Sequence, residues 1–338
     1  MELKIQEAKG LAVDILTSRG MRHDYAGMVA DHLVDAAMAG HAFAGLPRVL
    51  ALVEALEKKP PATAVTVVRE NRNSALIDGG DNNGYVTSVI GVDKAIALAK
   101  ASGIGIVGVR NTWFSGRLAY YVERAAHQNL IAFHTANSTA RVAPYGGIDA
   151  IFGTNPLAFA FPCEGEPLVV DVGTSAATWG ELLLRKRTGR KLDSNMAVDA
   201  AGQITDDPSA GLVGAILPWG GHRGSGLSLA VQVLGILAGS KLVIDDVDQY
   251  GFFFMVFDPE LLMPLGEFKS KVAQLRGILH RSRPTLGAER VRLPGEGSQA
   301  CRKRGLDAGT IMVDDKIYDA LLALRGSSGA RVAERSSA

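Results

Sequence analysis

The sequence contains few of the residues that build disulfide frameworks or zinc sites. Of its 338 residues only two are cysteines, Cys163 and Cys301, and they lie far apart in the chain. This number is too small for a disulfide framework, so we expect reduced thiols and a cytoplasmic location. The seven histidines are scattered, and none lies at zinc-ligand spacing from another histidine or a cysteine. We therefore expect no metal.

The chain also lacks an excess of charge of one sign and a long apolar run. Its formal net charge is only +1, so the overall charge points neither to nucleic acid nor to a membrane surface. The arginine-rich segment 276–304 is interpreted as a solvated surface, and the basic stretch 185–191 as a solvated loop in preference to a phosphate contact. The longest apolar run, near Leu227–Ala238, is too short to span a membrane and contains Gln232. We expect no nucleic-acid or membrane partner.

The stretch GIGIVG, residues 103–108, matches the dinucleotide-binding pattern G-x-G-x-x-G. In a Rossmann unit these glycines follow a strand and open a helix, whose amides meet the pyrophosphate. Here the hydrophobic pattern predicts a helix over 92–102 before the stretch and a strand over 104–109. We interpret Gly103 as the glycine that ends the helix. Any dinucleotide site must lie elsewhere.

The hydrophobic pattern predicts a helical start, a middle of mixed strands and helices, and a helical end. Helices are expected within 3–58, with Pro47 opening the last of them. Further helices are predicted at 92–102, 118–128, 225–237, 267–281 and 314–325. Strands are predicted at 64–68, 74–77, 104–109, 130–133, 156–161, 168–172 and 250–257. Residues 78–84 are expected to form a loop, residues 174–220 to be irregular, and the helix at 225–237 to be buried.

One middle stretch, HTANSTARVAPYGGIDAIFGTNPLAFAFP at residues 134–162, resembles the malate/L-lactate dehydrogenase family of the non-Rossmann kind. That family carries a T-N-S segment, present here as Ala136-Asn137-Ser138, followed by a G-G…G-T-N-P-x-A block. Further matches follow in family order over residues 3–325. They are VDVGTS at 170–175, LPWGGHRG at 217–224 with Arg223 in place of lysine, and LPGE at 293–296.

The resemblance implies an α/β fold with a non-Rossmann NAD(P)-binding domain. Its sheet should be mixed and largely antiparallel, and a helical domain should be built from both chain ends. We expect a helical N-terminal part at 1–60 and an NAD(P)-binding domain at 61–225. A helical C-terminal part at 226–325 should return to the N-terminal part, and a disordered tail should follow at 326–338. Members of the family are usually homodimers. The implied activity is hydride transfer between NAD or NADP and a small carboxylate-bearing C=O or C=N compound.

The matching segments carry residues suited to a dinucleotide. A pyrophosphate needs backbone amide donors, close approach and a cation; Gly173-Thr174-Ser175 suits the first two needs and Arg223 the third. Asn137 and Ser138 suit hydrogen bonds to a ribose or carboxamide. The resemblance assigns a full set to the cofactor: Asn137, Ser138, Asp171, Gly173, Thr174, Ser175, Arg223, Gly224, Pro294, Gly295 and Glu296.

The substrate side departs from the family pattern. The family motif G-x-x-S-H-G-x-x-R corresponds to residues 40–48, where Phe43 replaces the serine and Ala44 the histidine, while Arg48 remains. In the motif N-S-N-H-F-G, Phe114 replaces the second histidine. Neither replacement can transfer a proton, although a positioned acid accelerates such reactions typically by roughly 10²–10⁴-fold. Phe43, Ala44, Trp113 and Phe114 instead predict an apolar substrate pocket.

Three interpretations remain for the missing acid. The substrate can be a protonated imine, which needs no acid at the carbon that receives hydride. Another group can replace the histidines, with His222, His41, His134 and Tyr120 as candidates. The protein can also be a catalytically silent binding homologue, or a lyase or isomerase. Arg48 suits a substrate carboxylate, so Arg48, His222 and Tyr120 are the predicted catalytic residues, and the substrate is expected to be more apolar than lactate or malate.

Overall fold

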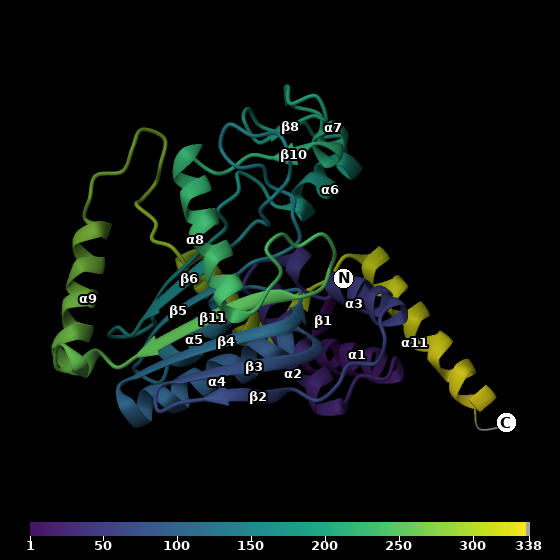
Figure 1. The fold of residues 1–338 in the computed structure, drawn as a ribbon, viewed down its shortest axis with the longest axis horizontal. Helices are drawn as coiled ribbons and strands as arrows, with labels where there is room; N and C mark the ends of the chain where they lie inside the picture. The colour runs from purple at the N-terminus through teal and green to yellow at the C-terminus, as the bar shows by residue number, and fades with distance from the viewer. Residues whose placement is uncertain (336–338) are drawn as a thin grey trace. The chain divides into compact units, whose positions relative to one another are not determined.

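The computed structural model describes residues 1–335, and side chains through residue 326. The chain forms two compact units (Figure 1). Unit 1 contains Met1–Ala62 and the chain from Arg283 onward, and unit 2 contains Thr63–Ser282. The division lies at residue 282 and not at 225, because residues 226–282 contribute a helix and a strand to the sheet domain.

Unit 1 is helical and is built from both chain ends, as predicted. Its two short strands, β1 (Glu2–Lys4) and β12 (Thr310–Met312), pair antiparallel. Its helices are α1 (Ile5–Ser18), α2 (His23–Met38), the 3₁₀ turn η1 (Ala42–Ala44), α3 (Pro47–Lys58), α10 (Glu296–Ala308) and α11 (Asp315–Arg335). Pro47 is the first residue of α3, as expected, since its missing amide proton would have no helical partner there.

The C-terminal segment of unit 1 differs from the sequence prediction in two ways. Helix α10 was not expected, since none of its residues is buried and no apolar stripe marks it in the sequence. In place of a disordered tail from residue 326, α11 continues to Arg335. Residues 336–338 of the expected tail lie outside the residues that the structure describes.

Unit 2 is organised around a seven-stranded sheet with the strand order β2-β3-β4-β11-β5-β6-β7. The strands are β2 (Thr66–Glu70), β3 (Ser74–Asn83), β4 (Ile104–Trp113), β5 (Ile131–Ala136), β6 (Leu157–Phe161), β7 (Leu168–Val172) and β11 (Tyr250–Phe257). Only β3 and β4 run parallel, and every other neighbouring pair is antiparallel. The predicted mixed, largely antiparallel sheet is therefore confirmed.

The two faces of this sheet carry different helices (Figure 1). Helices α4 (Gly84–Ser102) and α5 (Ala119–Ala126) pack on one face, and α8 (His222–Ala238) packs on the other. Successive strand residues point to opposite faces. In β4, Val109 accordingly packs against α4, whereas the Cα of Gly108 is close to Ala238 of α8.

The GIGIVG stretch has the structure that its context predicts. Helix α4 ends at Gly103, which has a left-handed φ of 83°, and β4 begins at the next residue. Gly105 is required because a Cβ there would lie 2.2 Å from the Ala95 carbonyl oxygen of α4. These glycines allow tight helix–strand packing, and the interpretation as a helix end and a strand is confirmed.

Two irregular regions were predicted wrongly. Residues 78–83 continue β3, with a shift of register between Asp78 and Asn82, and do not form a loop. Residues 174–220 contain α6 (Trp179–Thr188), α7 (Pro208–Val213) and a small antiparallel sheet of β8 (Ala197–Val198), β9 (Ile204–Thr205) and β10 (Ala215–Ile216). Strands of two residues are too short to show a hydrophobic period. Unit 2 also contains the turn η2 (Pro259–Leu261) and helix α9 (Leu265–His280).

Candidate functional site

The first turn of α8 is open to an anion. Two glycines with left-handed φ angles, Gly220 at 59° and Gly221 at 64°, lead into the helix. Among the described residues, the backbone amides of His222 and Arg223 have no hydrogen-bond acceptor. Such first-turn amides carry the positive end of the helix dipole. The side chains of His222 and Arg223 are both exposed, so amide donors and a guanidinium are available at one place.

The segment 173–175 lies directly beside this turn. The amide of Thr174 donates to Thr154 O at 3.0 Å, and the carbonyl of Thr174 accepts from Trp219 N at 2.9 Å. A Cβ on Gly224 would lie 2.1 Å from Trp219 O, so only glycine permits this approach. Two of the segments that the sequence assigns to the cofactor, 173–175 and 217–224, are therefore neighbours within unit 2.

The segment around Ser138 reaches the same region through the G-T-N-P turn. A Cβ on Gly153 would lie 2.2 Å from the Ser138 hydroxyl oxygen, and the next residue, Thr154, holds the Thr174 amide. Three separated stretches of the sequence thus meet in unit 2. The fourth assigned segment, Pro294-Gly295-Glu296, belongs to unit 1, where Gly295 has a left-handed φ of 82° and precedes α10.

Some of the assigned side chains face the protein interior. Asn137 is fully buried; its Nδ2 donates to Ser240 Oγ at 2.6 Å, and its Oδ1 accepts from Gly251 N at 2.7 Å. Thr174 is also buried, and its hydroxyl donates to Thr154 O at 3.1 Å. These two side chains hold the fold together. We keep Ser138, Gly173, Ser175, Arg223 and the backbone at Gly224 as candidate cofactor contacts.

Asp171 has a structural partner as well. Its Oδ2 accepts a hydrogen bond from Ala119 N at 2.8 Å, at the first residue of α5. A carboxylate at a helix start is stabilised by the helix dipole. Burial nevertheless raises the pKa of the Asp171 carboxyl above its ordinary value, against the lowering effects of that amide and of the Arg117 charge.

The predicted pocket residues of unit 2 lie in a strained part of the backbone. Trp113 is buried, and its Nε1 donates to Asp81 O at 2.8 Å. Phe114 is half-buried, with ring centroids 5.1 Å apart from Trp113, and has a left-handed φ of 53°. Asp81 and Asn111 have left-handed φ angles of 58° and 52°. A left-handed conformation is unfavourable for bulky residues and persists only where the surrounding structure holds it. Such residues are frequent at functional sites.

The remaining predicted residues divide between the units. Tyr120 is half-buried on α5, and its ring meets that of Tyr121 edge-on at 5.6 Å. In unit 1, Phe43 is 51% exposed and lies in η1, and Arg48 is half-buried in the first turn of α3. His41 Nε2 lies 3.0 Å from the hydroxyl of Ser298, on the helix that follows the P-G-E segment.

Comparisons with known proteins identify the family. The model of the malate/L-lactate dehydrogenase family matches residues 3–322. The chain belongs to this family. It is 32% identical over 331 residues to L-sulfolactate dehydrogenase of Methanocaldococcus jannaschii, covering 95% of each chain. It is 29% identical over 335 residues to Delta(1)-pyrroline-2-carboxylate reductase 1 of Burkholderia ambifaria, covering 95% of this chain and 97% of that relative. The solved structure of the M. jannaschii sulfolactate dehydrogenase matches with a TM-score of 0.88 at 31% identity, covering 97% of this chain and 98% of that one.

The predicted family and fold class are thus confirmed. The chain is a member of an oxidoreductase family, and its described fold is that of solved dehydrogenases of the family. Sequence reasoning missed one residue of the site region, Asn155. It lies in the G-T-N-P block that carried the resemblance, is fully buried and has a left-handed φ of 36°. Its partner Gln232 was visible in the sequence as a polar residue inside an apolar run.

His134, one of the candidate proton donors, has a structural role. Its ring is fully buried and stacked on Phe254 at 3.9 Å between centroids. Its Nδ1 lies 3.0 Å from Phe253 O, and because a carbonyl only accepts, Nδ1 must carry the proton. Burial lowers the pKa of His134 to about 3. The side chain is therefore neutral at physiological pH and has a structural role.

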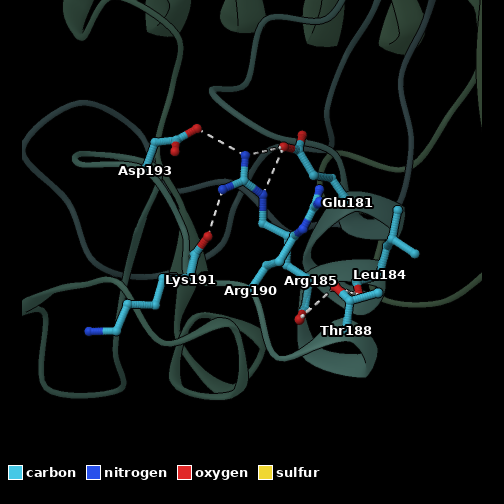
Figure 2. Close-up of a pocket in the computed structure, with 7 residues that line it drawn as sticks. All are labelled: Glu181, Leu184, Arg185, Thr188, Arg190, Lys191 and Asp193. Carbon is cyan, nitrogen blue, oxygen red and sulfur yellow. Dashed lines mark hydrogen bonds and ion pairs between the residues drawn. The ribbon is translucent and has the colours of Figure 1, made fainter.

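The basic stretch forms ion pairs with neighbouring acidic residues (Figure 2). Arg185 donates to Glu181 at 2.8 Å, to Asp193 at 2.9 Å and to the Lys191 carbonyl at 2.7 Å. Lys191 pairs with Asp206 at 2.6 Å. Glu181, Arg185, Lys191 and Asp193 border a surface cavity of about 560 Å³. The predicted loop is wrong for the first part of the stretch, because residues 185–188 belong to α6. Since Arg185 and Lys191 are paired with acidic residues, we keep the interpretation that the stretch is solvated and does not contact a phosphate.

The described residues contain neither a metal-binding cluster nor a helix suited to a membrane. In the part of the chain that the structure describes, no group of three or more His, Cys, Asp and Glu side chains is placed to hold a metal ion. None of the described helices combines the length and the apolar character needed to cross a membrane.

Proposed function

We propose that this protein is an NAD(P)-dependent oxidoreductase that transfers hydride to or from a carboxylate-bearing C=O or C=N compound. One observation carries the proposal. Ser138, the segment 173–175 and the first turn of α8 with Arg223 meet within unit 2, although they are far apart in the sequence. When bound, the nicotinamide nucleotide supplies or accepts the hydride.

The residues present fit a dinucleotide. A diphosphate requires amide donors, a cation and room for close approach. The amides of His222 and Arg223 supply the donors, and the Arg223 guanidinium supplies the cation. A Cβ on Gly220 or Gly226 would meet no atom within 4 Å, so the surface around the turn is open. NAD and NADP both remain candidates.

The substrate is proposed to be a small carboxylate with an apolar remainder. Arg48 offers a fork of donors that matches a carboxylate, and it remains where the family motif has its arginine. Phe43 and Phe114 replace polar family residues, and neither is fully buried. Their hydrocarbon surface favours a substrate that is more apolar than lactate or malate.

The loss of proton donors favours a C=N substrate over a ketone. Ala44 and Phe114 have no titratable proton, and His134 is buried and neutral. Of the other candidates, His222 is exposed in the first turn of α8, beside the proposed diphosphate site. Tyr120 and His41 remain as possible donors. A protonated imine needs none, because it already carries the charge that hydride neutralises.

The same loss supports a second candidate function, a catalytically silent nucleotide-binding homologue. Titration with NADH and with NADPH, followed by turnover of a panel of 2-keto acids and cyclic imino acids, separates the two. Binding with reduction of an imino acid supports the enzyme. Binding with no turnover on any substrate supports the silent homologue. Absence of nucleotide binding contradicts the proposal as a whole, whereas efficient turnover of malate or lactate contradicts only the more apolar substrate.

We also propose that the protein is a homodimer that buries the outer face of α8. This helix was expected to be buried, but Leu229, Val233 and Leu237 are 54%, 54% and 70% exposed. They recur every four residues and therefore form one apolar stripe. A charge there should weaken the dimer, so Val233→Glu is expected to elute as a monomer in size-exclusion chromatography with light scattering. A wild-type monomer would contradict the proposal.

A further inference from the structure

Helix α8 carries two buried polar side chains in an otherwise apolar run. Ser228 and Gln232 lie one turn apart on the face turned to the sheet, and both are buried. Burying a polar group is unfavourable unless it is hydrogen-bonded. Asn155 Nδ2 donates to the Gln232 side chain, at 2.9 Å from Oε1, and to the backbone carbonyl of Ser228 at 3.0 Å, whereas the Ser228 hydroxyl pairs with Thr174. The Nε2 of Gln232 donates to Leu242 O at 2.8 Å.

This network is continuous with the proposed nucleotide site. The hydroxyl oxygens of Thr174 and Ser228 lie 3.1 Å apart, within hydrogen-bond distance, and the Thr174 carbonyl accepts from Trp219 N. Trp219 in turn begins the glycine loop that leads into α8. Asn155, Ser228 and Gln232, which we call the Asn155 network, therefore connect the body of α8 to both backbone segments that border its first turn.

A second buried asparagine fixes the other end of α8. Asn137 bonds to Ser240 Oγ at 2.6 Å, just beyond the end of the helix, and to Gly251 at the start of β11. A Cβ on Gly235 would lie 2.2 Å from Asn137 Nδ2, so the helix is in close contact there. Within the described part of the chain, the hydrogen bonds of Asn137 and Ser240 do not reach Thr174 or the glycine loop. The two ends of α8 are thus held by separate attachments.

We propose that the Asn155 network is a positioning device for the nucleotide. It fixes the first turn of α8 against the segment 173–175, so that the free amides and Arg223 match the geometry of a diphosphate. The inference rests on the proposed function. Sites that bind charged groups need such support, because small displacements of the donors weaken several hydrogen bonds together.

A matched pair of serine variants tests this role. Ser228→Ala removes a hydroxyl from the Asn155 network, and Ser240→Ala removes one from the attachment at the other end of α8. For each we would measure the melting temperature and the affinity for NADH and for ADP-ribose, which keeps the diphosphate without the nicotinamide. We expect about fivefold weaker binding of both ligands for Ser228→Ala, and less than twofold for Ser240→Ala at a similar loss of melting temperature.

A second variant covers the case in which Ser228→Ala does not fold. Gln232→Met keeps the length of the side chain but removes its bonds to Asn155 and Leu242, and should weaken both ligands in the same way. If the wild-type chain binds NADH and these variants bind it equally well, the positioning role is wrong while the proposed function stands. Equal losses for Ser228→Ala and Ser240→Ala would likewise reduce the network to ordinary packing. If the wild-type chain binds no nucleotide, both proposals fall.

Discussion

The proposed nucleotide region and the proposed proton-donor positions differ in what their side chains do for the fold. In the nucleotide region, Asn137, Asn155 and Thr174 are buried and hydrogen-bonded to other segments of unit 2. At the donor positions, Phe43 is exposed, and Ala44 and Phe114 are half-buried. A residue that holds segments together is costly to change, whereas an outward-facing residue is not. A member of this family can therefore keep the nucleotide region while its chemistry toward the substrate changes.

The largest effect is expected where Gly251, which bonds to Asn137, lies against Gly235 of α8. Gly251→Ala would place a Cβ 2.2 Å from the Gly235 carbonyl oxygen, which is backbone and cannot turn aside. We expect a loss of about 3 kcal/mol or more in the free energy of unfolding, measured by urea denaturation. The control is Gly226→Ala on α8, where a Cβ meets nothing within 4 Å. It should stabilise the helix by about 0.5–1 kcal/mol. Similar unfolding free energies for the two variants would show that the contact between Gly251 and Gly235 does not stabilise the fold.

Substitutions at Phe43 and Ala44 should change the activity strongly without changing the stability of the fold. The double variant Phe43→Ser/Ala44→His restores the family's serine and histidine. We expect ketone reduction to rise by about 100-fold, within the range of general-acid catalysis and equal to about 3 kcal/mol of barrier. The measurement is kcat/KM for a 2-keto acid at constant nucleotide, with Phe43→Ser as the control that adds no donor. An unchanged rate would mean that another group already supplies the proton.

His134 allows a test of the interior by pH. Its pKa is about 3 in the folded chain, because burial disfavours the charged ring, and near the ordinary value of 6.5 when unfolded. The unfolded chain therefore binds more protons between these values, so stability falls as pH falls below about 6.5. We expect a loss of about 2 kcal/mol between pH 7 and pH 5 from this group. In His134→Phe, the dependence of the unfolding free energy on pH should decrease by the equivalent of about one proton. If this dependence is unchanged, groups other than His134 cause it.

The sequence predicts those features that depend on neighbouring residues, and it fails where a feature depends on residues far apart in the chain. Gly103 was identified because a helix end and a strand start are local signals. The strands β8 and β9 have two residues each, and none of the residues of α10 is buried, so these elements carry no periodic signal. The Asn137 side chain points into the protein because it bonds to Gly251, which lies 114 residues further along the chain. The sequence motif brings together segments that are neighbours in unit 2, but it could not separate their structural asparagines from residues that can face a ligand.

The smallest effect is expected at the departure from the motif within the nucleotide region, Arg223. Arg223→Lys restores the family's residue and keeps the cation, so NADH affinity should change by less than about threefold. Arg223→Ala removes the charge from an exposed site and should weaken binding by about tenfold, or 1.4 kcal/mol. Fluorescence titration at two salt concentrations measures both, since a phosphate contact weakens with salt. If the alanine variant binds as tightly as wild type at low salt, Arg223 is only a surface residue, and the first-turn amides alone must hold the diphosphate.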